Sequence, residues 1–266
     1  MALQFPEIDP IALHFTENFG IRWYALAYLA GILGGWYYAL HLVAKNKAAR
    51  PNKEDIEEVL SWLVMGIILG GRLGYVLFYN LPQYISHPWE VLYIWEGGMS
   101  FHGGLLGVVT AIVLYSRRNK FSILVLGDII STVVPVGLFF GRIANFVNGE
   151  LFGRVSNVSW AVVFPYGGDL PRHPSQLYEA FLEGLVLFTI MFVMSRKETV
   201  RKSTGMLTGT FVAGYGVCRF IIEFFREPDM QIGYIMKYFS MGQLLSLPMI
   251  AIGAYLIYRS RRMKTV

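Results

Sequence analysis

The sequence predicts an all-α polytopic membrane protein with seven transmembrane helices, and three observations support this fold class. Hydrophobic residues make up 55% of the 266 residues and charged residues only 15%, whereas a soluble domain carries about 25% charged residues. Seven apolar stretches are each long enough to cross the roughly 30 Å hydrocarbon core of a bilayer. The loops between these stretches are alternately rich and poor in lysine and arginine, as they are when a chain crosses a membrane repeatedly.

The first three predicted spans lie near residues 21–44, 56–79 and 98–116. All three are apolar over the roughly 17 to 25 residues that a membrane helix needs, and glycine and aromatic residues are frequent in them. The segment before the first span has Glu7, Asp9 and Glu17 in place of the positively charged start of a signal peptide. We therefore expect the first span to remain in the protein.

The fourth predicted span, residues 122–146, is almost unbroken in its apolar character and precedes the longest connection, residues 150–174. This connection contains the strand-like run SWAVVFP and then two glycines and two prolines. We expect it to form a small external head that ends where Pro174 starts a helix. The last three spans follow near residues 175–195, 205–225 and 240–259. No soluble domain is evident, so we expect residues 1–266 to form a single integral membrane domain.

The distribution of positive charge predicts the orientation of the chain. Fifteen of the 23 lysines and arginines lie in the loops after spans one, three and five or in the tail after span seven, and only four lie in the other loops. Because cytoplasmic loops carry the excess of positive charge, the N-terminus is predicted to be periplasmic and the C-terminus cytoplasmic. The net charge of +5 then reflects topology, and we expect no nucleic-acid partner.

Several polar side chains fall within the predicted spans, where an ionisable group costs about 2.5 kcal/mol or more. The predicted topology places the following near the outer face: Arg22, Tyr24, Arg72, His102, Arg142, Arg219 and Glu223. Arginine predominates, and its planar guanidinium suits bidentate contact with phosphate oxygens, so a phosphate-bearing lipid is the simplest ligand. The alternatives are that Arg142 only extends to the interface and that Glu223 forms a structural ion pair with Arg219.

Three further residues, His102, Asp128 and Cys218, could have either functional or structural roles. His102 lies between Ser100 and a glycine pair, where it could accept a proton at neutral pH or serve only in packing. Asp128 lies in the inner half of the fourth span and is predicted to be structural. Cys218 is the only cysteine, which excludes an intrachain disulfide and a multi-cysteine metal site, and we favour a packing role for it over a nucleophilic one.

Six sequence blocks resemble one known family. GRIANFVNGELFGR, residues 141–154, is similar to the signature of the prolipoprotein diacylglyceryl transferases. Five further segments of the chain resemble blocks of that family, in the family's order: RWYALAYLAG, GGRLGYVLFYN, GGMSFHGG, RHPSQLYEA and GYGVCRFIIEFFREPD. The resemblance implies a transferase of the bacterial inner membrane whose active site faces the outer leaflet or periplasm. Its substrates would be phosphatidylglycerol and the lipobox cysteine of a prolipoprotein signal peptide, and no metal or organic cofactor is implied.

Carried over position by position, the resemblance predicts the site residues. The predicted catalytic residues are His102, Arg142 and Arg219, with the arginines holding the phosphate and His102 taking the thiol proton or orienting the thiol. The predicted lipid-binding residues are Arg142, Arg219, Tyr24, Asn145, Glu150, Gly153, Tyr215, Glu223, Arg226 and, from topology, Arg72.

Two alternative functions remain compatible with the sequence alone. A lipid or organic-anion transporter would also use arginines to bind a phosphate in the outer leaflet. Such a transporter should have polar sites through the midplane to the inner face, where only Asp128 lies. A seven-span receptor would leave the group of arginines unexplained.

Overall fold

The computed structural model describes residues 3–16, 20–45, 50–227, 234–235 and 239–262, and these are mostly helical. The chain divides into two compact units. The large unit comprises Met1–Ala39 and Asp128–Val266, and the small unit comprises Leu40–Gly127. The single membrane domain expected from the sequence stays a prediction.

Each predicted span coincides with helical structure. The helices are α1 (Trp23–Ala44), α2 (Lys53–Phe78), α4 (Phe101–Arg118), α5 (Ile123–Val147), the continuous Ser175–Arg196 segment, α9 (Met206–Ile222) and α10 (Met241–Arg262). Within the described residues, five are long and apolar enough to cross a membrane: α1, α2, α5, Ser175–Arg196 and α10. Helix α9 is apolar but shorter, at 17 residues. Membrane character is thus confirmed, whereas the count of seven spans stays a prediction.

The Ser175–Arg196 segment changes its helical type twice. It begins as α6 (Ser175–Glu179), passes through the π-helix η3 (Ala180–Val186) and ends as α7 (Leu187–Arg196). Pro174 is the N-cap residue of α6, as expected from the sequence. Short π-helical insertions in α-helices occur frequently at functional sites, and this one contains the buried carboxylate of Glu183.

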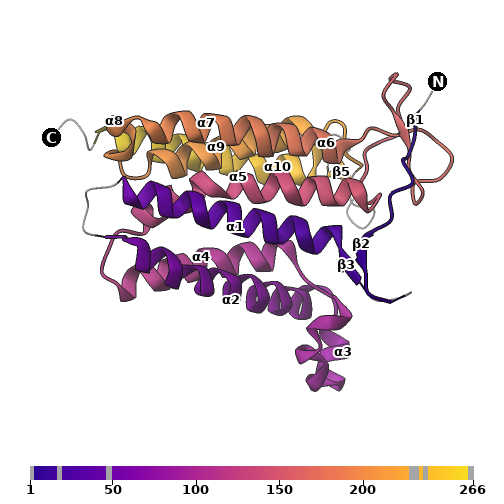
Figure 1. The fold of residues 1–266 in the computed structure, drawn as a ribbon, viewed down its shortest axis with the longest axis horizontal. Helices are drawn as coiled ribbons and strands as arrows, with labels where there is room; N and C mark the ends of the chain where they lie inside the picture. The colour runs from indigo at the N-terminus through magenta and orange to yellow at the C-terminus, as the bar shows by residue number, and fades with distance from the viewer. Residues whose placement is uncertain (1–2, 17–19, 46–49, 228–233, 236–238, 263–266) are drawn as a thin grey trace. The chain divides into compact units, whose positions relative to one another are not determined.

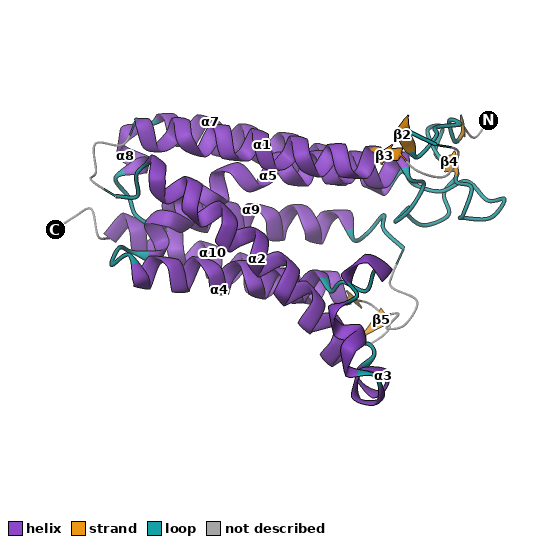
Figure 2. Cartoon of the chain, turned by 60° about the horizontal axis from the view of Figure 1, so that its bottom comes forward, coloured by secondary structure: helices purple, strands orange, loops and turns teal. Residues whose placement is uncertain are grey.

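The remaining elements are short. The helical ones are α3 (Leu81–Ser86), η1 (Pro88–Leu92), η2 (Ile94–Glu96) and α8 (Glu198–Arg201). The strands pair as β1 (Leu3–Gln4) parallel to β4 (Val162–Val163), β2 (Ile11–His14) antiparallel to β3 (Gly20–Arg22), and β5 (Tyr234–Ile235) antiparallel to β6 (Phe239–Ser240). Figure 2 shows β2, β3 and β4 at the end of the large unit where α1 begins.

The head predicted for residues 150–174 contains β4, within the strand-like run that the sequence indicated. Its strand partner is β1 at the N-terminus, a long-range pairing that the sequence did not reveal. Rings of Phe5, Phe146 and Phe164 pack together between these segments, with centroid separations of 5.4 to 6.0 Å. The head is therefore joined to the N-terminal segment by a β-ladder and to the end of α5 by an apolar contact.

In the large unit, α9 packs against α7 and α10 (Figure 1). Asp128, near the start of α5, fixes the beginning of α9, because its carboxylate accepts hydrogen bonds of 2.7 Å from Gly205 N and from both Thr208 N and Thr208 Oγ1. This is the function of an N-cap residue, supplied here from another helix. The structure agrees with the structural role that the sequence predicted for Asp128.

Glycines determine the packing of the small unit. Gly66, Gly70 and Gly74 on α2 face Gly103 and Gly107 on α4, and a Cβ added at Gly70 would overlap the backbone of Gly103. Small residues four positions apart allow the backbones of two membrane helices to approach closely. The Ser100 side chain accepts a 3.2 Å hydrogen bond from Gly103 N and thereby caps α4.

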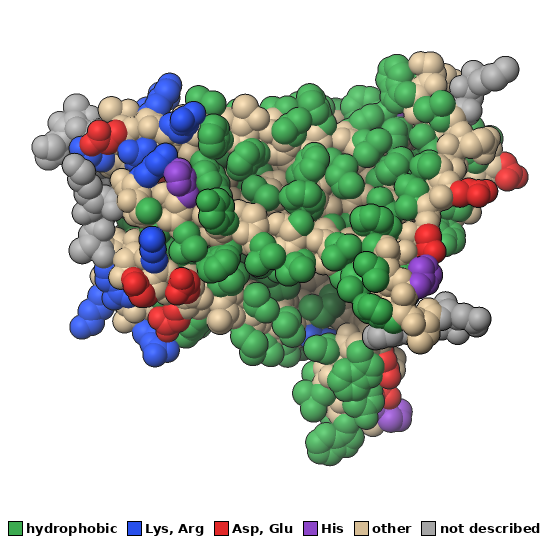
Figure 3. Space-filling view, in the orientation of Figure 1, with side chains coloured by type: hydrophobic (Ala, Val, Ile, Leu, Met, Phe, Trp, Pro, Cys, Tyr) green, Lys and Arg blue, Asp and Glu red, His purple; other side chains and the backbone are tan. Residues whose placement is uncertain are grey.

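Large hydrophobic side chains remain exposed along the helices, among them Leu29 and Leu33 on α1 and Ile190 and Val193 on α7. Figure 3 shows such side chains over α1 and α7, with lysines and arginines gathered at the end near α8. Water would penalise an apolar surface of this extent, and lipid would not. The arrangement supports a membrane location.

Candidate functional site

Glu179 lies at the centre of an ionic cluster in the large unit, and its side chain has no exposed surface. Its Oε1 accepts hydrogen bonds of 3.0 Å from Arg219 Nη1 and from Arg226 Nη1. Its Oε2 lies 3.0 Å from Arg142 Nε. One carboxylate thus brings together arginines from α5, from α9 and from the turn that follows α9.

Two further glutamates complete the cluster. Arg142 Nη2 lies 3.4 Å from Glu183 Oε2, and Arg219 Nη2 lies 2.5 Å from Glu223 Oε1. The pairing of Arg219 with Glu223 was anticipated from their spacing of four residues. The three arginines and three glutamates together carry no net formal charge. This mutual neutralisation offsets the cost of removing the charged groups from water.

Close packing between α5 and η3 places the charged residues together. Gly184 lies against the backbone of Phe139, and a Cβ at position 184 would be 2.8 Å from Phe139 Cα. Arg142 follows Phe139 by three residues, and Glu183 precedes Gly184, so this contact brings the two charged side chains to the same face. The absence of a side chain at Gly184 therefore permits the Arg142–Glu183 ion pair.

The polar end of α5 forms a second group of contacts. Helix α5 ends at Val147, and the chain then turns back, so that Asn145 Nδ2 donates a 2.9 Å hydrogen bond to Glu150 Oε1. Gly149 has a φ of +66° in this turn, a conformation that glycine adopts without strain. Both Glu150 and Arg154 thus lie beyond the end of the helix.

Arg154 and Gly153 connect the head to the end of α9. Arg154 donates hydrogen bonds to the backbone oxygens of Arg226 and Glu223, at 2.7 and 2.9 Å. Gly153 N donates to His173 O at 2.8 Å, and a Cβ on Gly153 would overlap backbone atoms on both sides. Burial and the positive charge of Arg154 lower the pKa of His173 from its ordinary value. The join between the head and the end of α9 thus requires a small residue at position 153.

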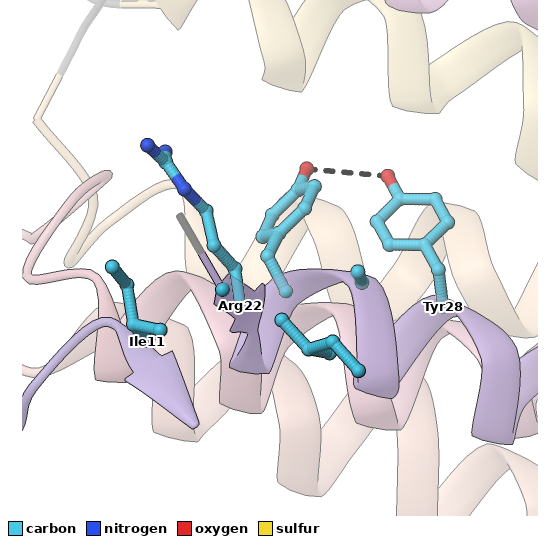
Figure 4. A pocket seen from close by; sticks show the side chains of 7 residues that line it. Ile11, Arg22 and Tyr28 are labelled. Carbon is cyan, nitrogen blue, oxygen red and sulfur yellow. Dashed lines mark hydrogen bonds between the residues drawn. The ribbon is translucent and has the colours of Figure 1, made fainter. Parts of the chain in front are cut away.

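A pocket of about 630 Å³ opens at the start of α1, and Figure 4 shows it. It is lined by Ile11, Gly20, Ile21, Arg22, Tyr24, Ala25 and Tyr28. The hydroxyl groups of Tyr24 and Tyr28 lie 3.2 Å apart, and Tyr24 is within electrostatic range of Glu150 and Arg142. An apolar pocket with few polar groups beside an arginine suits an amphiphile with an anionic headgroup.

Tyr215 belongs to the same neighbourhood. It lies on α9 one turn before Arg219, its ring stacks on Phe211 at 6.0 Å, and it is within electrostatic range of Arg142 and Glu183. The large unit therefore contains nine of the predicted site residues in one region: Tyr24, Arg142, Asn145, Glu150, Gly153, Tyr215, Arg219, Glu223 and Arg226.

Arg72 and His102, the other two predicted site residues, belong to the small unit. Arg72 is buried, and all three of its guanidinium nitrogens donate to backbone oxygens, among them those of Glu90, Val91 and Gly97 at 2.5 to 2.9 Å. These contacts favour a structural role, in which Arg72 holds the segment of residues 90–98. His102 is exposed in the first turn of α4, beside the ring of Phe101.

Glu179 and Glu183 were not singled out from the sequence. The signal was present, because both carboxylates fall within a predicted span, where ionisable groups are expensive. Glu179 also lies within the block RHPSQLYEA. Their partners lie about 40 positions away in the chain, so the pairing itself could be seen only in the fold.

Comparison with known proteins shows the family of the chain. The family model described as prolipoprotein diacylglyceryl transferase matches residues 10–259. The chain belongs to this family. Similar members are the proteins named phosphatidylglycerol–prolipoprotein diacylglyceryl transferase of Rhodospirillum centenum, 55% identical over 97% of this chain and 94% of the relative, and of Azospirillum brasilense, 54% identical over 98% of each. The namesake of Rhodospirillum rubrum is 52% identical over 99% of this chain and 96% of its own.

Proposed function

We propose that this protein transfers the sn-1,2-diacylglyceryl group of phosphatidylglycerol to the lipobox cysteine thiol of prolipoproteins. The proposal rests on membership of the diacylglyceryl transferase family. It is supported by a cluster of half-buried arginines, one of which, Arg142, is in electrostatic range of the pocket residue Tyr24. The products are a thioether and glycerol 1-phosphate.

The reaction forms one bond and breaks one. The cysteine sulfur attacks the diacylglyceryl carbon that is bonded to a phosphate oxygen, and the electron pair of the broken C–O bond remains on the phosphate. In our proposal Arg142 and Arg219 stabilise this charge, an effect often worth about 3 kcal/mol per donor. Within the part of the chain that the structure describes, their contacts with glutamates leave Arg142 Nη1 and Arg219 Nε for the phosphate.

The other large-unit residues would bind the headgroup. Tyr24, Asn145 and Glu150 position its glycerol, Glu223 orients Arg219, and Gly153, Tyr215 and Arg226 complete the wall of the site. His102 takes the thiol proton or orients the thiol, because a thiol with a pKa of about 8.5 reacts as the thiolate.

We further propose that the protein spans the bacterial inner membrane seven times with a periplasmic N-terminus. The site would then face the outer leaflet, where the lipid and the signal peptide of a secreted lipoprotein meet. The excess of lysine and arginine in alternate loops supports this orientation.

Mass spectrometry of a lipobox peptide tests the function. The purified protein is incubated with phosphatidylglycerol vesicles and the peptide, and we expect a diacylglyceryl mass gain on cysteine that Arg142→Ala abolishes. Arg117→Ala, an exposed arginine at the end of α4, is the control that should keep full activity. Lipid binding without any mass gain would contradict the transferase proposal and favour a carrier.

A further inference from the structure

Glu179 and Glu183 have no part in the bond changes described above, yet both side chains are fully buried beside the proposed phosphate site. They lie four residues apart, at the end of α6 and within η3. Glu179 contacts Arg142, Arg219 and Arg226, and Glu183 contacts Arg142. Their common feature is contact with the arginines that we assign to the phosphate.

The contacts fix the guanidinium groups in orientation as well as position. Arg142 is held at Nε by Glu179 and at Nη2 by Glu183, at 3.0 and 3.4 Å. Only the contact with Glu183 has hydrogen-bond geometry, and the contact with Glu179 is an ion pair. Because the guanidinium group is planar and its donors point in fixed directions, the two contacts together limit where Nη1 points. Arg219 is held in the same way at Nη1 by Glu179 and at Nη2 by Glu223.

The glutamates also keep unused capacity to accept hydrogen bonds. Glu183 Oε1 and Glu179 Oε2 are buried without a hydrogen-bonding partner among the described residues, and so is Oε1 of the neighbouring Gln176. An unsatisfied buried acceptor is costly, so we expect a ligand hydroxyl group to donate to it. The glycerol headgroup of the lipid carries such hydroxyl groups.

We propose that Glu179 and Glu183 are positioning residues for diacylglyceryl transfer. They orient Arg142 and Arg219 toward the lipid phosphate and balance the arginine charge when no lipid is bound. This inference rests on the proposed transferase function. It assigns to the Ser175–Arg196 helix a role in aligning the site, in addition to crossing the membrane.

The test uses the full-length protein and the peptide assay, with initial rates measured over a range of phosphatidylglycerol concentrations. Glu179→Gln keeps the size of the side chain and removes its charge. We expect kcat to fall at least about tenfold with KM changed less than about threefold, because arginines that are misplaced by about 1 Å stabilise the departing phosphate poorly. Glu183→Gln should cause a smaller fall in kcat. Glu198→Gln, on the exposed helix α8, is the matched control and should leave both constants unchanged.

A double-mutant cycle separates positioning from general stability. If Glu179 acts through Arg219, then Glu179→Gln should reduce kcat much less in an Arg219→Lys background than in the wild type. A purely structural glutamate would reduce activity by the same factor in both backgrounds, and this result would overturn the proposal. Glu179→Asp keeps the charge but shortens the side chain, so it provides the same test if Glu179→Gln does not fold.

The outcomes distinguish the two proposals. A wild-type protein that transfers no diacylglyceryl group contradicts the proposed function itself. A wild-type protein that is active, together with folded Glu179→Gln and Glu183→Gln variants of unchanged kcat, contradicts only the positioning role. Folding is judged by size-exclusion chromatography and thermal unfolding of the same preparations.

Discussion

Gly184→Ala should misalign the proposed active site without touching a charged residue. The new Cβ would lie 2.7 Å from Phe139 Cβ and 2.8 Å from Phe139 Cα. Optimal contact between carbon atoms requires about 3.5 to 4.0 Å, so α5 and η3 must separate by about 1 Å. Such overpacking typically costs about 1 to 3 kcal/mol of stability, partly offset by the roughly 0.5 to 1 kcal/mol that alanine gains over glycine in a helix.

The separation acts on the cluster because Arg142 is one turn beyond Phe139. A shift of this size would lengthen the 3.4 Å contact between Arg142 Nη2 and Glu183 Oε2 and the 3.0 Å contact with Glu179 Oε2. A misplacement of about 1 Å can reduce a rate by about 100-fold. We therefore predict that kcat/KM for diacylglyceryl transfer falls about 10- to 100-fold, whereas the protein still folds.

The assay is the initial rate of the diacylglyceryl mass gain on a lipobox peptide, normalised to folded protein. Gly137→Ala is the matched control, since a Cβ at that position on α5 meets no described atom within 4 Å, and it should retain full activity. A folded Gly184→Ala variant with the wild-type rate would refute the argument that close packing of α5 and η3 sets the position of Arg142.

Three other predictions concern stability. Asp128→Ala removes the capping carboxylate of α9 and should lower unfolding stability by about 1 to 2 kcal/mol, seen as a lower Tm in detergent with activity retained per folded molecule; an unchanged Tm would contradict the capping role. Gly70→Ala should lower Tm because its Cβ overlaps the backbone of α4, whereas Gly104→Ala, with 3.7 Å to the nearest atom, should not. Because the pKa of His173 is lowered in the folded protein, the unfolded chain binds the proton more readily, so stability should fall as the pH drops below about 6.5. His173→Gln should weaken this pH dependence, and an equal slope in both proteins would exclude His173 as its source.

Many features of the fold follow from local sequence. A run of apolar residues of sufficient length has to form a helix in a membrane, because lipid cannot satisfy the backbone polar groups. All seven predicted spans are accordingly helical in the structure. The pairing of β1 with β4 was not predicted, since it joins segments that are distant in the chain. The π-helical turn of η3 was not predicted either.

The residues of the candidate site were likewise predicted only in part from the sequence. The cost of burying charge was sufficient to single out Arg142, Arg219 and Glu223 from the sequence, and the family blocks added Asn145 and others. The same cost argument also placed Arg72 in the lipid site, although the structure shows its guanidinium bonded to backbone oxygens. The free-energy cost of burying a charge identifies an unusual residue, but it does not show which group that residue contacts.

The sequence by itself determined the membrane class, the helical segments, the family and most residues of the proposed site. Hydropathy, charge distribution and local motifs depend only on the order of residues in the chain. Only the tertiary structure decided that the arginines are held by Glu179 and Glu183. That pairing requires α5, the continuous α6–η3 segment and α9 to pack closely enough for side chains about 40 residues apart to come within 3.0 to 3.4 Å. The physical reason is that ion pairs depend on distance in space, which glycine packing sets and sequence spacing does not.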